Sequence, residues 1–334
     1  MQAPFWLPLW QAAESILSVA TESAIVLPVM VLLCLLLGRR RQRAAMARAC
    51  RLFLVLGFVT AGFGALAVAG QGFVSLIALP SAMESLTPLP FEPLSTPWLS
   101  TTTGFLAWIS GIVLLTACWL FARPVLGTAI AEMDDRTAAR MNRLALFAGL
   151  AALAAFFCYG ASFVLRSWPF LGLPDQMTRD TVLQVLVKHT WTTSCAALMP
   201  AGALAVLTFF LQLPPVSAKL KREDRENRRS EVIPGTAEDL LPFSSEQKTT
   251  LRMCAAFALA GAAFQVMDAS FLAFNPMAAM GSGLRAALMR FGPFLVSALS
   301  IVCWAFIFSR PRRHQLFLAL LPVLLIFLRA AGGF

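Results

Sequence analysis

Long apolar stretches separated by short polar segments are the dominant pattern along the chain. A helix needs about 20 mainly apolar residues to cross the roughly 30 Å hydrocarbon layer of a bilayer. Eight stretches have this length, near residues 15–38, 52–78, 103–122, 144–165, 184–212, 250–274, 287–308 and 315–332. The pattern therefore predicts an all-α membrane protein with eight transmembrane helices.

The composition agrees with this pattern and excludes several classes of protein. The chain has 334 residues, of which 58% are hydrophobic and 13% are charged. Soluble domains are nearer half apolar and a quarter charged, so a water-soluble enzyme, a disordered regulator and a disulfide-stapled secreted domain are excluded. The first apolar stretch is followed, not preceded, by the basic run 39–43. We therefore expect it to remain as an anchor and not to be removed as a signal peptide.

Basic residues are distributed unevenly between the loops. If the N-terminus lies outside, 21 of the 27 Lys and Arg residues fall on the inside and six on the outside. Cytoplasmic loops of membrane proteins carry such an excess of positive charge. This predicts two extracytoplasmic termini in a bacterial cytoplasmic (inner) membrane. The net charge of +10 is then a determinant of topology, and we expect no nucleic acid among the partners.

Short segments recur in the two halves of the chain in the same order. The pairs are 22–28 (ESAIVLP) with 194–200 (SCAALMP), 48–50 (RAC) with 252–254 (RMC), and 118–124 (CWLFARP) with 303–311 (CWAFIFSRP). With an even number of spans, two repeated units have the same orientation. The repeat predicts two tandem parallel four-helix bundles, and chance similarity between apolar segments is the alternative. Pro28 and Pro200 each free a backbone carbonyl that a neighbouring helix or water must satisfy.

The predicted organisation follows from this repeat. Residues 1–166 form the first bundle, which holds the candidate quinone site, 167–213 the helix that opens the second, 214–248 a charged cytoplasmic linker and 249–334 the last three helices. The outer loop 79–102 is rich in Pro, Ser and Thr and is a candidate cap or docking surface.

Several kinds of redox site have no suitable residues. The two histidines, His189 and His314, belong to opposite faces of the membrane and cannot ligate one haem. The seven cysteines contain no C-x-x-C pair, and we interpret them as small buried hydrophobes. We therefore expect no haem and no metal bound by this chain.

Two acidic residues lie inside predicted spans, where ionisable side chains are costly and usually functional. Glu22 and Asp268 are each about 10 Å below the outer end of a helix. Lys188, Arg285 and other basic residues near the outer boundary are expected to extend toward the membrane surface. This one-sided distribution predicts a polar pocket that opens at the outer side. The alternative is that the two acids pair structurally with the basic residues.

A carboxylate beside an apolar cleft suits proton-coupled quinol chemistry, because oxidation of a quinol releases protons that an acid or a histidine can accept. Glu22 and His189 are the candidate residues for this proton transfer. Tyr159, Trp108 and Asp268 are candidates for binding the quinone. Tyr159 is the only tyrosine, and the sequence allows it equally to face lipid.

Features of the first 125 residues resemble the haem-free membrane anchors of DMSO-reductase-type and polysulfide-reductase-type (NrfD-like) complexes. They are the basic turn after the first helix, the segments 50–57 (CRLFLVLG) and 79–85 (LPSAMES), and 98–100 (WLS) before the third helix. The resemblance implies an anchor that exchanges electrons between menaquinone, or another quinone, and a ferredoxin-like iron–sulfur subunit. Through that subunit it would serve a molybdopterin-containing catalytic subunit.

One position departs from the pattern of these anchors, and two other classes of function stay open. Ile77, Ala78 and Leu79 occupy the outer end of the second helix, where such anchors often carry a histidine, and this bears on the quinone site.

A small-solute transporter is favoured by the repeat and the two mid-span prolines. A membrane scaffold without a ligand is the third possibility.

Overall fold

A computed structural model describes residues 6–37, 43–78, 97–127, 135–167, 179–213, 243–274, 284–312 and 315–332. Within these ranges the regular structure is helical, which confirms the all-α prediction. The helices are α1 (Trp6–Leu37), α2 (Arg43–Ala78), α3 (Pro97–Gly127), α4 (Asp135–Ser167), α5 (Arg179–Leu211), α7 (Ser245–Phe274), α8 (Leu284–Ser309) and α9 (Leu316–Gly332).

The apolar helices are compatible with a bundle that crosses a membrane several times. Within the described ranges, seven helices are long and apolar enough to span a bilayer. The apolar stretch described in α9, Leu316–Ile326, is shorter than this. Large apolar side chains such as Leu66, Phe157 and Val302 point away from the protein and are more than 60% exposed, as expected for a surface that faces lipid.

α1, α2 and α4 begin well before the apolar stretches that predicted them, and in α2 and α4 the added turns are polar. α2 begins at Arg43 and α4 at Asp135, whereas the predicted spans began near 52 and 144. Ala, Arg and Met, which are frequent in these first turns, favour helix even where they are not apolar enough to lie in lipid. The hydropathy pattern therefore located the part of each helix that crosses the bilayer and missed its polar extension.

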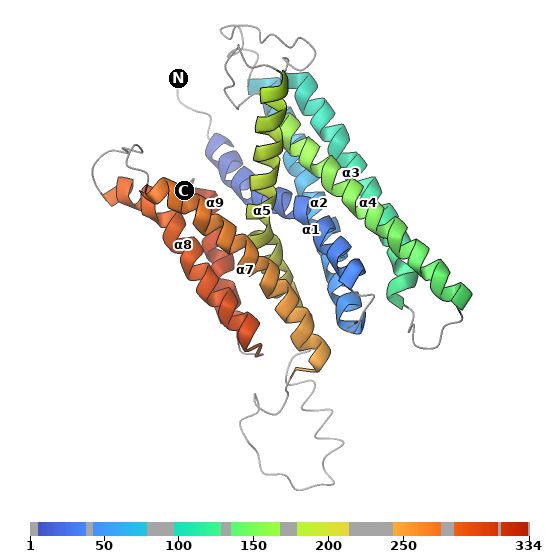
Figure 1. Cartoon of the computed structure of the whole chain (residues 1–334). Coiled ribbons are helices and arrows are strands. Elements are labelled where there is room, and N and C mark those ends of the chain that lie inside the picture. Colours follow the sequence, from blue (N-terminus) through green and yellow to red (C-terminus); the bar gives the residue numbers. More distant parts are fainter. Residues whose placement is uncertain are drawn as a thin grey trace, which may run out of the picture.

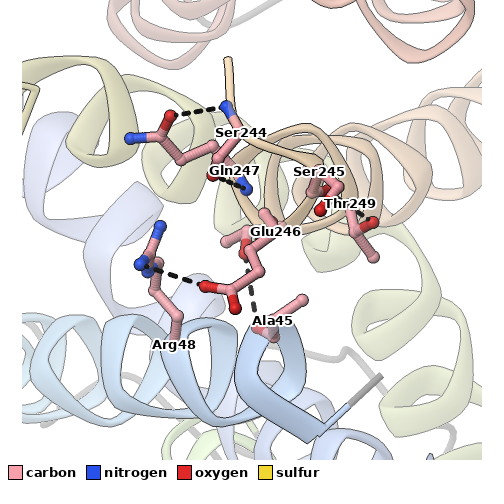
Figure 2. Close-up of polar contacts among 8 residues, drawn as sticks. Ala45, Arg48, Ser244, Ser245, Glu246, Gln247 and Thr249 are labelled. Atoms are coloured by element: carbon pink, nitrogen blue, oxygen red, sulfur yellow. Dashed lines mark hydrogen bonds and ion pairs between the residues drawn. The ribbon is translucent and has the colours of Figure 1, made fainter. Parts of the chain in front are cut away.

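α7 also begins earlier than expected, inside the segment 214–248 that was predicted as a linker. The backbone amide of Gln247 donates to Ser244 Oγ at 3.2 Å, and the backbone amide of Ser244 donates to Gln247 Oε1 at 3.0 Å. This reciprocal pair is a capping box, which satisfies free amides at a helix N-terminus (Figure 2). Residues 214–242 lie outside the described ranges, so the remainder of the linker prediction is not addressed.

The helices contact one another in two rings, which meet where α1 contacts α5 and α9 and where α2 contacts α7. In the first ring α1 contacts α2, α2 contacts α3, α3 contacts α4 and α4 contacts α1. In the second, the same order holds for α5, α7, α8 and α9. Figure 1 shows α5 between the blue-to-green helices and the orange-to-red ones. The apolar stretches of α1 and α5 are each 67% buried, compared with 28% for α3, so α1 and α5 form the centre of the protein.

The backbones of α5 and α7 approach closely at two glycines. A Cβ atom added at Gly261 would collide with the backbone at Met199, and one added at Gly202 would collide with the backbone of Ala258. Small residues permit such close packing between membrane helices. This contact fixes the position of α7 against the centre of α5.

Arginines join the helices at one end of the bundle, which we call the basic end. Arg51 Nη2 donates to the Leu126 carbonyl at 2.6 Å, and Arg252 Nε donates to the Phe308 carbonyl at 3.2 Å. The last carbonyls of a helix have no partner in the helix itself, so these contacts satisfy the ends of α3 and α8. Arg48 forms an ion pair with Glu246 at 3.4 Å between α2 and α7 (Figure 2). Because both side chains of this pair are nearly half exposed, its contribution to stability is small.

The α5–α7 contact gives a prediction about stability. Substituting Gly261 by Ala should lower the free energy of unfolding by about 1–3 kcal/mol, because backbone atoms cannot move aside as a flexible side chain can. Thermal unfolding of the purified protein in detergent measures this change. Gly62→Ala is the matched control, since nothing lies within 4 Å of the added Cβ at that position. Equal unfolding temperatures for the two variants would contradict the close packing.

Candidate functional site

A cavity of about 1000 Å³ lies between the two rings of helices. Its walls come from α1, α4, α5, α7, α8 and α9. Its residues extend from the middle of these helices, at Met199 and Pro200 of α5, toward the ends that are remote from the basic end. The cavity thus extends toward the end of the bundle where the sequence predicted a pocket, but most of its described lining belongs to α5 and α7 and not to the first ring.

The cavity brings together three charged residues from three helices. Glu22 of α1, Lys188 of α5 and Asp268 of α7 all line it. Lys188 and Asp268 are exposed, and Glu22 is partly buried. The other polar side chains of the wall are Ser18, Thr192, Thr193 and Gln265. Two carboxylates that are 246 positions apart in the sequence thus face one space, as their similar depths in the membrane suggested.

The remaining wall is mainly apolar and partly aromatic. Its larger apolar side chains are Val19, Phe163, Trp191, Met199, Phe264, Val296 and Ile326. Trp191 is 67% exposed and Phe264 43% exposed, so aromatic side chains stand where the cavity meets its surroundings. Pockets for organic ligands have volumes of roughly 300–1000 Å³ and combine apolar walls with a few polar groups. The cavity has the size and the lining for an amphipathic organic molecule.

The wall of the cavity contains Pro200, which lies inside α5. Pro200 has no amide hydrogen, so the Ala196 carbonyl one turn earlier has no partner within the helix. Gln265 Nε2 of α7 donates to this carbonyl at 3.0 Å. All three residues line the cavity. The sequence predicted that a neighbouring helix or water must satisfy the freed carbonyl, and for Pro200 the helix is confirmed.

Trp108 and Tyr159 pack inside the first ring, and Tyr159 is one turn of α4 before Phe163 of the cavity wall. Both are fully buried in the first ring, and their ring centroids are 4.6 Å apart. Trp108 packs on Gly64 and donates from Nε1 to the Ala61 carbonyl at 2.9 Å, and Tyr159 packs on Gly111. Neither is among the described residues that line the cavity. Their contacts join α2, α3 and α4, and a role in binding quinone stays a prediction from sequence for both.

His189 and the outer loop lie partly outside what the structure describes. His189 belongs to α5 and follows Lys188 directly, but its side chain is outside the described residues. Of the predicted cap 79–102, residues 79–96 are outside the described ranges, and the remainder forms the first turns of α3. The proposed proton transfer by His189 and the capping role of the loop therefore stay predictions.

The structure adds residues to the site that the sequence analysis did not select. Gln265 and Trp191 both line the cavity. Gln265 could have been found, because it lies three residues before Asp268 and therefore on the same face of a helix. Trp191 follows Lys188 by three residues in the same way. Both residues share a helix face with a charged residue, and this spacing is the sequence signal that indicates them.

The polar groups that line the site are two carboxylates, one ammonium group, hydroxyl groups, the Gln265 amide and the Cys195 thiol. In the part of the chain that the structure describes, no group of three or more His, Cys, Asp or Glu side chains gathers in one place. The seven cysteines are free thiols, and five of them are buried. Glu22, Asp268 and Lys188 can exchange protons and form hydrogen bonds with a molecule in the cavity.

No protein-family model matches the chain, and neither a curated protein nor a solved structure matches it. The resemblance to membrane anchors of oxidoreductases stays a prediction from the sequence, and the cavity carries the argument about function.

The hydrogen bond between Gln265 and the Ala196 carbonyl gives a second prediction. Gln265→Leu removes the donor to the Ala196 carbonyl and should cost about 1 kcal/mol of stability. In a Pro200→Ala background the helix can satisfy that carbonyl itself, so the same substitution should cost much less. Unfolding temperatures of the two single variants and the double variant measure this coupling. Additive effects would show that Gln265 does not act through the carbonyl that Pro200 leaves without a partner in α5.

Proposed function

We propose that the protein is an integral membrane subunit of a respiratory oxidoreductase and that it binds a quinol or quinone in the cavity between the two rings. The observation that carries the proposal is that Glu22 and Asp268 share one cavity of about 1000 Å³ with aromatic and aliphatic side chains. A quinone has a flat ring with polar oxygens and an apolar tail, so it needs both kinds of surface. Menaquinone and other membrane quinones have this chemistry.

The aromatic and the polar residues have distinct parts in this proposal. Trp191, Phe163 and Phe264 offer flat apolar surfaces to the ring and tail, and carboxylates orient the ring through hydrogen bonds to its hydroxyl groups. Glu22 accepts a proton from one quinol hydroxyl as the quinol is oxidised. Asp268, which is exposed, passes protons onward to water. Lys188 holds positive charge beside the two carboxylates and offsets part of their repulsion.

The reaction is balanced by partners outside this chain. Oxidation of one quinol to quinone releases two electrons and two protons. The protons pass to the carboxylates of the cavity and then to water. The electrons pass to the attached ferredoxin-like iron–sulfur subunit that the sequence resemblance implies, and from there to a molybdopterin-containing subunit. In quinone reduction each transfer runs in the opposite direction.

The two rings support a tandem duplication as part of this proposal. If Cys50 is aligned with Cys254, Gly57 is aligned with Gly261. A Cβ atom at Gly57 would lie nearest Leu115 of α3, at 3.2 Å, and 3.9 Å from Leu27 of α1, whereas one at Gly261 would collide with the backbone at Met199 of α5. Leu27 and Met199 are each one residue before the proline of their helix. The second and third helices of each ring are also joined by an arginine near the basic end. With the basic end in the cytoplasm, both termini are outside and the cavity belongs to the outer leaflet of a bacterial inner membrane.

Transport of a small solute is the second candidate function. It is favoured by the position of the cavity, which lies between two similar units and beside the proline of α5, since binding sites of transporters often lie beside interrupted helices. Transport requires access from both sides of the membrane. Ala205 of α5 is fully buried on the basic side of Pro200 and would lie on such a path.

Access to the cavity distinguishes these two functions. A cysteine at Thr193, which lines the cavity, should react with a membrane-impermeant thiol reagent added outside, in a variant that lacks the native cysteines. A cysteine at Ala205 should not react from the inside, because a quinone site needs no such path. Mass spectrometry of labelled inverted and right-side-out vesicles gives both results. Reaction at Ala205 from the inside would favour transport.

The role of Glu22 is tested in the complex with its partners. Glu22→Gln keeps the size of the side chain but removes the proton acceptor, and should lower the rate of electron transfer from a quinol analogue by about 100-fold. Binding of the analogue should change little. Glu246→Gln is the matched control, because Glu246 is an exposed acid at the basic end. Unchanged electron transfer in Glu22→Gln would favour a membrane scaffold without a ligand. The proposal would be overturned if the protein purifies without an iron–sulfur partner and does not bind the quinone analogue.

A further inference from the structure

Three arginines form one stripe on the exposed face of α4 near the basic end. Arg136, Arg140 and Arg143 are all exposed. Their spacing of four and three residues places them on the same face of the helix, over a length of about 10 Å. The stripe continues along this face with Phe147 and Leu150, which are 50% and 54% exposed. A row of positive charge thus runs directly into a row of apolar side chains.

The neighbouring helix extends the apolar part of this surface. Phe121 of α3 packs against Phe147 of α4, with ring centroids 5.8 Å apart. Leu120, one residue earlier in α3, is 56% exposed. The surface made by the ends of α3 and α4 therefore has positive charge at the basic end and an exposed apolar part above it.

These arginines differ from others at the basic end in their surroundings. Arg51 and Arg252 donate to helix carbonyls, and Arg48 pairs with Glu246. For Arg140 and Arg143, no hydrogen bond or ion pair with another described residue is found. The acidic residues nearest in sequence are at positions 132, 134 and 135, before the stripe.

We infer that this surface binds an anionic phospholipid of the leaflet at the basic end. The phosphodiester group lies between Arg140 and Arg143, and an acyl chain lies along Phe147 and Leu150. The planar guanidinium group of arginine binds phosphate oxygens through two hydrogen bonds, which a neutral side chain cannot do. A lipid is the occupant that fits, because its charged head and apolar tail match the order of the two parts of the surface. This inference is independent of the proposed quinone site.

Native mass spectrometry of the purified full-length protein tests the inference. Phosphatidylglycerol and phosphatidylcholine of the same acyl chains are added in equal amounts, and the bound lipid is counted. The wild-type protein should prefer phosphatidylglycerol. In the variant R140Q/R143Q, the ratio of bound phosphatidylglycerol to bound phosphatidylcholine should be roughly 10- to 30-fold lower, as expected for the loss of two positive charges near a lipid surface.

The matched control is R310Q/R312Q, which removes two exposed arginines elsewhere at the basic end. This control should keep the preference for phosphatidylglycerol. If the double variant R140Q/R143Q does not purify as a folded protein, each single substitution is measured and should lose part of the preference. The inference is overturned if the wild type shows no preference, if R310Q/R312Q loses as much as R140Q/R143Q, or if no substitution at Arg140 or Arg143 has an effect.

Discussion

The need to satisfy backbone polar groups away from water is the constraint on which the site depends. Pro200 leaves the Ala196 carbonyl without a partner in α5, and Gln265 of α7 supplies one at 3.0 Å. In hydrocarbon an unsatisfied carbonyl costs several kcal/mol, so this hydrogen bond stabilises the position of α7 against α5. Gly202 and Gly261 permit this approach because no Cβ separates the two backbones. The same contact brings Asp268, one turn after Gln265, to the wall of the cavity.

The two ends of the bundle use charge in different ways. At the basic end, arginines satisfy the last carbonyls of α3 and α8 and join helices that are distant in sequence. At the other end, Glu22, Lys188 and Asp268 surround open space. Charge at the first end contributes to the scaffold, whereas charge at the second faces a volume that can hold a ligand. This separation is the physical basis for placing the site away from the basic end.

The sequence predicted the helices well because crossing a bilayer demands a length and a composition that few other structures share. It also predicted similar depths for Glu22 and Asp268, and both residues line one cavity in the structure. Helix starts such as Ser244 were missed, because a capping box depends on a few polar residues and not on hydropathy. Trp108 and Tyr159 show a second limit. Depth in the membrane can be estimated from sequence, but the direction of a side chain around the helix depends on packing, here against Gly64 and Gly111.

The most direct test of the central claim is photoaffinity labelling with an azido derivative of a membrane quinone, followed by mapping of the labelled peptides by mass spectrometry. Label is expected in α5 and α7 near Met199 and Phe264, and an excess of unmodified quinone should prevent it. Label confined to other surfaces, such as the exposed faces of α3 and α4, or label that unmodified quinone does not reduce, would contradict the assignment of the cavity as a quinone site.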